Sequence, residues 1–390
     1  MEKVNEFGKP LWIATLDFQK AFDSVSHAAI WEALAKQGVH TTYIDLLQRL
    51  YDGQLAYVQT DQPSRQFPIH RGTKQGDPIS PILFNAVIEH IMSKLKYQWG
   101  ARKYGFSIKD FMDNITNLRY ADDILLIARS LPQMRQMLSD VARESALVGL
   151  RLHPGKTKIL HNSIGYGSKA HVAKCGELNI DILDPSDGAQ YLGRVVRLTC
   201  MDDEEIASRI SKGWAKYGVY TRELTDRRIP LRLRLKLFEA VITPTVLYGS
   251  EAWTMTQQRL AKLQTAQRRM LRNLTQSHRS YDHFDNYIDW IQHATDKVES
   301  LMGQFGIEAW TKLQQSKKWK WADNVACSPG AKWSRLVAEW RIYDTRPQGR
   351  PRTRWEDSII QRLAEITTTR PITHEWCSAM RHVFSSDLAL

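Results

Sequence analysis

Two apolar runs in the first half of the chain carry aspartates where each run ends or turns. Residues 11–17 read LWIATLD and residues 118–128 read LRYADDILLIA. Short apolar runs bounded by turn residues predict buried strands, and two such runs around a polar pair predict a tight hairpin. Uncompensated carboxylates beside a core repel one another unless a divalent cation neutralises them. The pattern therefore predicts a sheet that carries Asp17, Asp122 and Asp123 at one cation site, although an isolated pair of aspartates is more often an exposed turn.

The ligand chemistry of these carboxylates favours magnesium. Mg²⁺ prefers oxygen ligands, takes one or two protein carboxylates and fills its shell with water and phosphate oxygens. Two such ions about 3.5–4 Å apart can activate an attacking oxygen and stabilise a leaving one in phosphoryl transfer. The carboxylates therefore favour Mg²⁺ as the bound ion.

Hydrophobic periodicity predicts helices and strands in alternation through the first 200 residues. Helices are expected at 27–38, 41–50, 79–98 and 133–148, a strand at 157–161, and hairpins at 55–70 and 189–198. This order fits an antiparallel sheet backed by helices, related to the split βαβ arrangement. After residue 202 the pattern is helical, except that LRLRLKL at 231–237 fits either a strand or a helix.

The charge balance indicates a polyanionic partner. Lysine and arginine number 54 against 42 aspartates and glutamates, a net charge of +12, and ten of the 13 tryptophans lie after residue 200. The sequence has no apolar run long enough to span a membrane and no apolar signal segment at its start. Its four cysteines form no CxxC pair. We therefore expect an intracellular protein, nuclear or cytoplasmic, that is neither secreted nor membrane-spanning.

Five segments together resemble the ordered motifs of reverse transcriptases from non-LTR (LINE-type) retrotransposons. In chain order they are ATLDFQKAFD at 14–23, RGTKQGDPISP at 71–81, YADD at 120–123, GLRLHPGKTK at 149–158 and YLG at 191–193. Each alone is a weak signal, except that YADD is nearly diagnostic, and five in this order are a strong one. The resemblance extends over about residues 10–275 and implies an RNA-directed DNA polymerase that adds deoxynucleotides to a primer 3′-hydroxyl on an RNA template.

The same resemblance implies the fold and its divisions. The fold class is α+β, with the palm of a right-hand polymerase, an antiparallel sheet backed by helices, over residues 1–198 together with partial fingers. A helical thumb is expected over 199–278. A basic, Trp-rich helical region is expected over 279–390.

Carried over residue by residue, the resemblance implies the metal ligands. Asp17, Asp122 and Asp123 are the expected catalytic residues, and they are expected to hold two Mg²⁺ ions, for which Mn²⁺ can substitute. The backbone carbonyl of Phe18 is expected to be a further ligand.

The resemblance also implies the nucleotide contacts. Phe22 is expected to be a steric gate against the 2′-hydroxyl of ribonucleotides, a role compatible with a core position. Gln75 and Gly76 are expected to line the templating pocket, where a residue without Cβ lets the backbone approach a base pair. Lys156 is expected to face the triphosphate and to help neutralise the departing pyrophosphate.

Two groups of residues are expected to contact the nucleic acid. The resemblance makes Tyr191, Leu192 and Gly193 the primer grip. Phosphate contacts are expected from arginines in the basic helix at 257–274 and in the loop at 346–354, namely Arg268, Arg269, Arg272, Arg350, Arg352 and Arg354.

Three other patterns in the sequence suggest functions that their residues support poorly. GKT at 155–157 suggests a P-loop, but that motif needs glycine at position 150, which is leucine. His374, Cys377 and His382 lack a fourth ligand for structural zinc. The tryptophans of 310–340 could stack on single-stranded bases, but a helical bundle that buries the indoles is the favoured interpretation.

One departure from the family leaves an alternative function open. Only about ten residues precede the first strand, where family members carry a fingers region and often an endonuclease further upstream. We expect the chain to be N-terminally truncated, with a separately encoded fingers region or endonuclease considered as a further partner. The alternative is a catalytically impaired retrotransposon remnant that only binds nucleic acid; a maturase-like splicing cofactor is disfavoured.

Overall fold

The computed structural model divides the chain into two compact units. Unit 1 comprises Met1–Thr199 with Ile342–Pro347, and unit 2 comprises Cys200–Arg341 with Gln348–Leu390. The predicted divisions at residues 198 and 278 stay predictions. The structure describes residues 1–74, 76–108, 113–162, 164, 171–199, 201–276, 286–342, 348–349, 352–367, 371 and 375–385.

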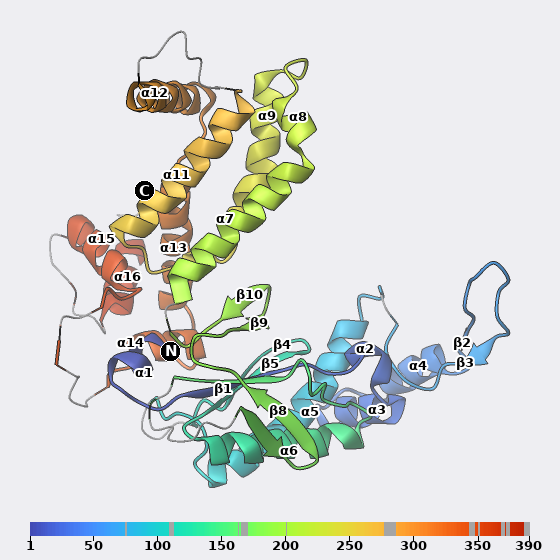
Figure 1. The fold of residues 1–390 in the computed structure, drawn as a ribbon. Helices are drawn as coiled ribbons and strands as arrows, with labels where there is room; N and C mark the ends of the chain where they lie inside the picture. The colour runs from blue at the N-terminus through green and yellow to red at the C-terminus, as the bar shows by residue number, and fades with distance from the viewer. Residues whose placement is uncertain are drawn as a thin grey trace. The chain divides into compact units, whose positions relative to one another are not determined.

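A mixed sheet forms the centre of unit 1 (Figure 1). Within the described ranges its six strands have the order β4-β5-β1-β6-β8-β7. Every neighbouring pair is antiparallel except β6 and β8, which are parallel. The strands are β1 (Trp12–Leu16), β4 (Asn117–Tyr120), β5 (Asp123–Ala128), β6 (Lys158–His161), β7 (Val172–Cys175) and β8 (Leu178–Ile182).

The parallel pair corrects the expectation of a wholly antiparallel sheet. The β7–β8 hairpin, which sequence patterning did not predict, joins the sheet through β8 and not through β7. LNIDI has the alternation of a half-buried strand but VAKC does not, and runs of four and five residues are a weak signal on their own. The fold class is nevertheless α+β.

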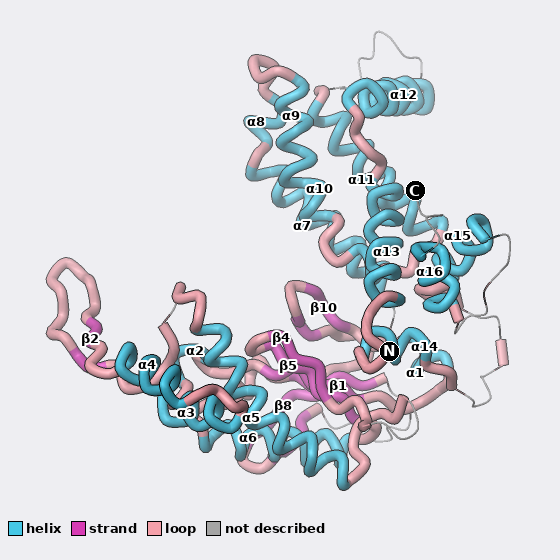
Figure 2. Tube along the Cα trace, turned by 180° about the vertical axis from the view of Figure 1, so that it is seen from behind, coloured by secondary structure: helices cyan, strands magenta, loops and turns pink. Residues whose placement is uncertain are grey.

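Helices cover one face of this sheet. Helix α6 packs against β1 and β5, and α5 packs between α3 and α6, as Figure 1 and, from behind, Figure 2 show. The four helices predicted in this unit are all present, with ends shifted by at most three residues. The helices of unit 1 are α1 (Glu2–Glu6), α2 (Ala21–Ser24), α3 (His27–Lys36), α4 (Thr41–Tyr51), α5 (Ser80–Ala101) and α6 (Leu131–Leu147).

Two short hairpins complete unit 1. β2 (Leu55–Ala56) pairs with β3 (Phe67–Pro68), and β9 (Ala189–Tyr191) pairs with β10 (Arg194–Val196). Both were expected from the sequence, although the first pairs over fewer residues than its alternating pattern suggests.

Unit 2 is helical in its described part. One hydrophobic cluster extends from Ile206 to Trp310, and another from Ala322 to Val383 includes Cys377 of the disfavoured zinc site. The elements are α7 (Met201–Val219), α8 (Thr221–Thr225), α9 (Leu231–Leu237), a π-helical turn (Phe238–Ile242), α10 (Thr243–Val246), a 3₁₀ turn (Ser250–Ala252), α11 (Gln257–Leu274), α12 (Tyr287–Phe305), α13 (Trp310–Ala326), α14 (Trp333–Glu339), α15 (Asp357–Thr367) and α16 (Trp376–Ser385).

The tryptophans of the C-terminal half divide between core and surface. The Trp310 side chain is fully buried and stacks on Phe238 with ring centroids 5.8 Å apart. Its indole N–H donates to the Thr243 hydroxyl at 2.9 Å. Trp321, by contrast, is 46% exposed. The buried interpretation is therefore confirmed for Trp310. Within the described residues, the helices are too short or too polar to cross a membrane.

The ambiguous segment at 231–237 is the helix α9, and a buried arginine explains part of its stability. Arg234 is only 8% exposed. Its guanidinium donates to the carbonyls of Ile229 at 3.1 Å, Leu224 at 3.3 Å and Leu274 at 2.8 Å. Leu274 ends α11 and Leu224 lies in the last turn of α8, where helices leave carbonyls without an internal partner. Arg234 thus joins three segments of unit 2.

Replacement of Arg234 by methionine is expected to destabilise unit 2 by about 2–4 kcal/mol, because it leaves buried carbonyls without their charged donor. Urea unfolding followed by tryptophan fluorescence measures the change. Arg232→Met is the matched control, since Arg232 is exposed in the same helix and its loss should change the free energy of unfolding by less than about 0.5 kcal/mol. Equal effects of the two variants would contradict the role of Arg234.

Candidate active site

Strand pairing places Asp17 beside Asp123. β1 and β5 are antiparallel with Leu16 opposite Ile124, and the same register continued by one residue sets Asp17 opposite Asp123. Leu16 and Ile124 belong to the hydrophobic core beneath the helices. Because successive side chains of a strand point to opposite faces, both aspartates project from the face opposite to those helices.

Asp122 lies in the turn between β4 and β5. Tyr120 pairs with Asp123, which leaves Ala121 and Asp122 as a two-residue turn. Ala121 has a φ of +52°, in the left-handed region that two-residue hairpin turns require and that residues with a Cβ adopt at some cost. The turn holds two carboxylates side by side at the end of the strand pair.

The three carboxylates interact electrostatically. Partial burial raises the pKa of Asp123 above its usual range, and the negative charges of Asp122 and Asp17 raise it further. Asp17 itself keeps 40% of its side chain exposed. Since like charges oppose one another here, a divalent cation at this position would be stabilising.

The donor chemistry at this position fits magnesium. The three side chains supply only oxygen ligands, as Mg²⁺ prefers. Among the described residues, no group of three or more His, Cys, Asp or Glu side chains converges closely enough to hold a metal ion. Mg²⁺ usually needs only one or two protein carboxylates and completes its shell with water and substrate phosphate, so the residues present still suit it.

The backbone of Phe18 is oriented toward the same site. Gln19 donates its N–H to the Arg151 carbonyl and His153 donates to the Asp17 carbonyl, both at 2.8 Å. In an antiparallel ladder, the residue between two such bonds directs its own N–H and C=O to the other edge of the strand. The Phe18 carbonyl therefore points toward the side of the β4–β5 turn, while its ring is buried in the core.

A lysine lies next to the carboxylates. The Lys156 ammonium is 3.8 Å from the nearer carboxylate oxygen of Asp17, and 64% of the lysine side chain is exposed. The loop that carries it is fixed by hydrogen bonds from Lys156 N–H and Thr157 N–H to the His153 carbonyl, at 3.2 and 2.9 Å. An exposed ion pair of this kind contributes little to the stability of the fold. The ammonium can therefore move from Asp17 to another anion at little cost in free energy.

The β9–β10 hairpin brings a tyrosine toward the carboxylates. Tyr191 pairs with Arg194, and the turn residues Leu192 and Gly193 have φ values of +48° and +71°. Positive φ at both central positions is typical of a type I′ hairpin turn. Burial raises the pKa of the Tyr191 phenol, and the nearby charge of Asp123 raises it further. The predicted primer grip therefore has one member within electrostatic range of the predicted catalytic site.

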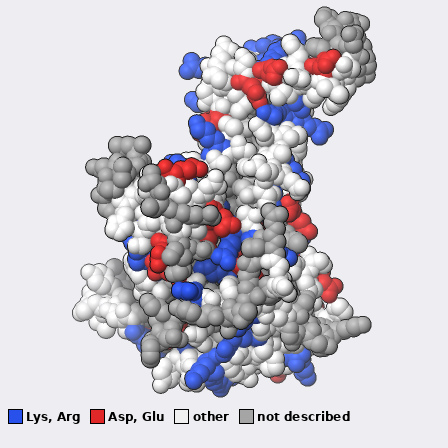
Figure 3. All heavy atoms as spheres, turned by 90° about the vertical axis from the view of Figure 1, so that its left-hand side faces the viewer, with Lys and Arg blue, Asp and Glu red and all other residues white. Residues whose placement is uncertain are grey.

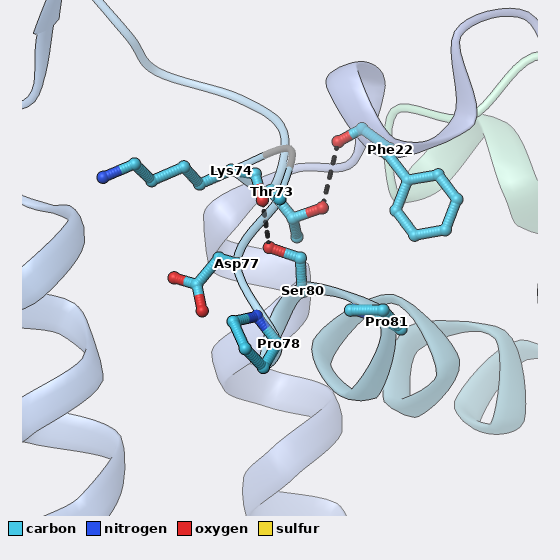
Figure 4. Close-up of a pocket in the computed structure, with 8 residues that line it drawn as sticks. Phe22, Thr73, Lys74, Asp77, Pro78, Ser80 and Pro81 are labelled. Atoms are coloured by element: carbon cyan, nitrogen blue, oxygen red, sulfur yellow. Dashed lines mark hydrogen bonds between the residues drawn. The ribbon is translucent and has the colours of Figure 1, made fainter.

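A cavity of about 420 Å³ lies between Phe22 and the loop that precedes α5 (Figure 4). The Phe22 ring packs against Phe84 of α5 with ring centroids 4.6 Å apart. Of the two expected templating residues, Gly76 lines the cavity and Gln75 lies outside the described residues. The lining residues are Phe22, Thr73, Lys74, Gly76, Asp77, Pro78, Ser80 and Pro81.

The far end of this loop is fixed by polar residues that sequence reasoning did not single out. The Ser80 hydroxyl donates to the Lys74 carbonyl at 2.6 Å, and the Asp77 carboxylate accepts the Ile79 N–H at 3.1 Å. Gly76 between them has a φ of +84° with open space around it, so its conformation and not a contact requires glycine. The signal was present within RGTKQGDPISP, as an aspartate and a serine at the start of a helix.

The predicted phosphate-binding arginines of α11 have partners within unit 2. Arg268 pairs with Glu299 of α12, and the guanidinium of Arg269 lies 5.5 Å from the ring centre of Trp214. Burial lowers the pKa of Arg272, whose guanidinium donates to the hydroxyl of Thr295 in α12 at 3.3 Å. Phosphate contacts by these side chains stay predictions.

The second group of arginines is only partly described. Arg352 is exposed, Arg354 lies 3.6 Å from the Glu356 carboxylate, and Arg350 lies outside the described residues. On the face of the molecule in Figure 3, acidic side chains lie among the basic ones.

Comparison with known proteins identifies the family. Residues 1–196 match the family model described as reverse transcriptase (RNA-dependent DNA polymerase), which is half of the chain. The chain belongs to the reverse transcriptase family. All five motifs of this reverse transcriptase, from Asp17 to the β9–β10 turn, lie within the matched residues.

The relatives of this reverse transcriptase are transposon proteins. It is 30% identical over 260 residues to a putative uncharacterized transposon-derived protein of Caenorhabditis elegans, covering 65% of this chain and 86% of the relative. It is 32% identical over 212 residues to the Pol polyprotein of the type-2 retrotransposable element R2DM of Drosophila melanogaster, covering 52% of this chain and 19% of that protein. The predicted kinship with non-LTR retrotransposon reverse transcriptases is confirmed.

The coverage differs widely among these relatives. The chain spans 33% of an R2 Pol polyprotein of Popillia japonica, to which it is 27% identical over 255 residues, or 63% of this chain. Among solved structures, apo telomerase from Candida tropicalis aligns with a TM-score of 0.36 and 12% identity over 86% of this chain and 54% of the telomerase chain.

Proposed function

We propose that this reverse transcriptase copies RNA into DNA by joining an incoming deoxynucleotide to a primer 3′-hydroxyl with loss of pyrophosphate. The observation that carries the proposal is the strand register that sets Asp17 opposite Asp123, with Asp122 in the adjoining turn. Three neighbouring carboxylates on one side of a sheet repel one another. A phosphoryl-transfer site accounts for this arrangement, because the metal ions that it requires are held by carboxylates.

Asp17, Asp122, Asp123 and the Phe18 carbonyl would hold two Mg²⁺ ions, or Mn²⁺ in their place. Bound there, the ions supply activation of the attacking hydroxyl and stabilisation of the leaving oxygen. The protein's own contribution is to hold the carboxylates in place through the β1–β5 pairing and the two-residue turn.

The nucleotide would enter between the carboxylates and the cavity at Phe22. The Phe22 ring, fixed against Phe84, would occupy the space of a ribose 2′-hydroxyl, while Gly76 and Gln75 would border the templating base. Lys156, 3.8 Å from Asp17, would offer its ammonium to the triphosphate and neutralise charge that develops on the departing pyrophosphate.

The template and primer would be an RNA strand and a DNA strand. The net charge of +12 supports binding of a duplex through its phosphates. The nearness of Tyr191 to Asp123 supports a primer-grip role for Tyr191, Leu192 and Gly193, because the primer 3′ end must reach the metal site.

Primer extension tests the proposal. The chain is incubated with poly(rA)/oligo(dT), dTTP and Mg²⁺, and product length is followed on a gel with and without EDTA. Extension that requires the metal is the expected result. Binding of the primer–template without any extension, in Mg²⁺ or Mn²⁺, would favour the alternative, a retrotransposon remnant that only binds nucleic acid.

Loss of the Lys156 charge is expected to impair nucleotide use more than template binding. Lys156→Ala should lower kcat/KM for dTTP by about 10- to 100-fold, since a charge-assisted phosphate contact contributes about 1.5–3 kcal/mol. The Kd for primer–template should change by less than about threefold. Lys174→Ala, which removes an exposed lysine from β7, is the matched control and should retain wild-type kinetics. A normal kcat/KM in Lys156→Ala would remove the assigned role.

A further inference from the structure

One peptide group beside the cavity is held from two sides. The N–H of Thr73 donates to the carbonyl of Phe22 at 2.7 Å. The carbonyl of Gly72, which belongs to the same peptide group, lies 2.9 Å from Nε2 of His27. A carbonyl only accepts hydrogen bonds, so Nε2 carries the hydrogen in this contact. The His27 ring and the Phe22 backbone therefore fix the plane of a single peptide.

This peptide is one that could rotate. Gly72 has a φ of +88°, and a Cβ at this position would lie 2.8 Å from the Asp23 backbone, so glycine is required. Glycine leaves the peptide after it freer to turn than any residue with a side chain. A turn of the 72–73 peptide would take the Thr73 N–H away from Phe22, while the Gly72 N–H could keep its bond of 2.7 Å to the Val25 carbonyl.

The His27 ring is well placed to prevent that turn. His27 is the first residue of α3, and its ring meets the Tyr51 ring edge-on at a centroid distance of 5.1 Å. Trp31, one turn further along α3, lies 6.3 Å from the His27 ring centre. Packing among these aromatic rings limits the rotamers of His27, so the donor stays aimed at the loop.

The peptide between Gly72 and Thr73 lies beside the cavity at Phe22, where the nucleotide is proposed to be selected. Phe22 and Thr73 both line the 420 Å³ cavity, and Phe22 bonds to Thr73 through its carbonyl. The Thr73 hydroxyl also donates to this carbonyl, at 3.3 Å. Because Thr73 joins the loop to the Phe22 backbone, a turn of the 72–73 peptide would change the spacing between the loop and Phe22. We infer that His27 is a positioning residue that sets the width of the nucleotide pocket and thereby its selectivity for the sugar, an inference that rests on the proposed polymerase function.

Three variants separate the hydrogen bond from the packing around it. His27→Phe keeps an aromatic ring and removes the donor. His27→Gln replaces the ring with an amide whose N–H can reach a similar position. Tyr51→Phe is the matched control, because the buried Tyr51 hydroxyl has no hydrogen-bond partner within the described residues and its loss leaves His27 in place.

The first measurement is amide hydrogen exchange at Thr73 in the full chain, which requires no activity. His27→Phe should exchange about tenfold faster than wild type, in line with loss of one hydrogen bond, and His27→Gln should recover most of the protection. Tyr51→Phe should match wild type. Unchanged exchange at Thr73 in His27→Phe would overturn the inference.

The second measurement is kinetic and uses poly(rA)/oligo(dT) with dTTP or UTP. In His27→Phe, KM for dTTP should rise about tenfold with kcat within about threefold, and discrimination against UTP should fall about tenfold. A parallel fall of kcat for both nucleotides with unchanged discrimination would indicate a merely structural role and overturn the inference. An inactive wild-type chain would overturn the proposed function and the selectivity role together, while the exchange result would still report on the hydrogen bond.

Discussion

Replacement of Asp123 by alanine is expected to reduce primer extension about a thousandfold or more, because it removes one of the carboxylates that would hold the metal ions at the reacting phosphate. Asp17→Ala and Asp122→Ala should behave alike. Affinity for primer–template should change little, because binding rests on basic groups elsewhere. Extension assays and filter binding at a stated salt concentration measure the two effects.

Two controls make this prediction specific. Asp123→Asn keeps the shape of the side chain and removes one of three like charges, so it should be as stable as wild type or more stable, while still inactive. Asp181→Asn removes an exposed carboxylate from β8 of the same sheet, where it pairs with Lys158, and should retain activity. Wild-type extension by Asp123→Ala would refute the assignment of the site.

The second large effect is expected at Phe22. Phe22→Val should lower the preference for dTTP over UTP by about 10- to 200-fold, because it opens space where a 2′-hydroxyl would lie. The ratio of kcat/KM for the two nucleotides measures this. The change should come mainly from a higher kcat/KM for UTP, while kcat/KM for dTTP should fall by less than about tenfold.

Phe22 also packs against Phe84, so a loss of stability must be separated from a loss of selectivity. Leu138→Ala supplies that comparison, since Leu138 is fully buried in α6 and lines no part of the cavity. It should lower the melting temperature without admitting UTP. An active Phe22→Val enzyme with unchanged discrimination would show that another residue provides the gate.

Local sequence pattern was sufficient for the elements that carry the site. The apolar runs before Asp17 and after Asp123 predicted β1 and β5, which are buried strands between turn signals. The segment before Asp122 was also predicted as a strand, although three of the four residues of β4 are exposed. Five motifs in order predicted the family that the comparison confirmed. The roles of the individual site residues stay predictions.

Local pattern left the choice open where a segment fits two structures equally well. LRLRLKL at 231–237 alternates with period two, yet it forms α9 because Arg234 finds three carbonyl partners from other segments in the interior of unit 2. Pattern also carries no information about the neighbours of Arg268 and Arg269 of α11, which are Glu299 and Trp214; their predicted phosphate contacts stay predictions. Neither neighbour is near in sequence.

Hydrophobic periodicity and turn chemistry over a few residues were enough to predict the strands that carry the site, the turn between β4 and β5 and the carboxylates available for chemistry. Which segments meet, and the burial of a charged residue such as Arg234, depend on contacts between distant parts of the chain. Distant segments are joined in three places: Leu16 pairs with Ile124, β8 pairs in parallel with β6, and His27 contacts Gly72. Such contacts depend on how whole faces pack together, because one buried face can be covered by many partners of similar hydrophobicity.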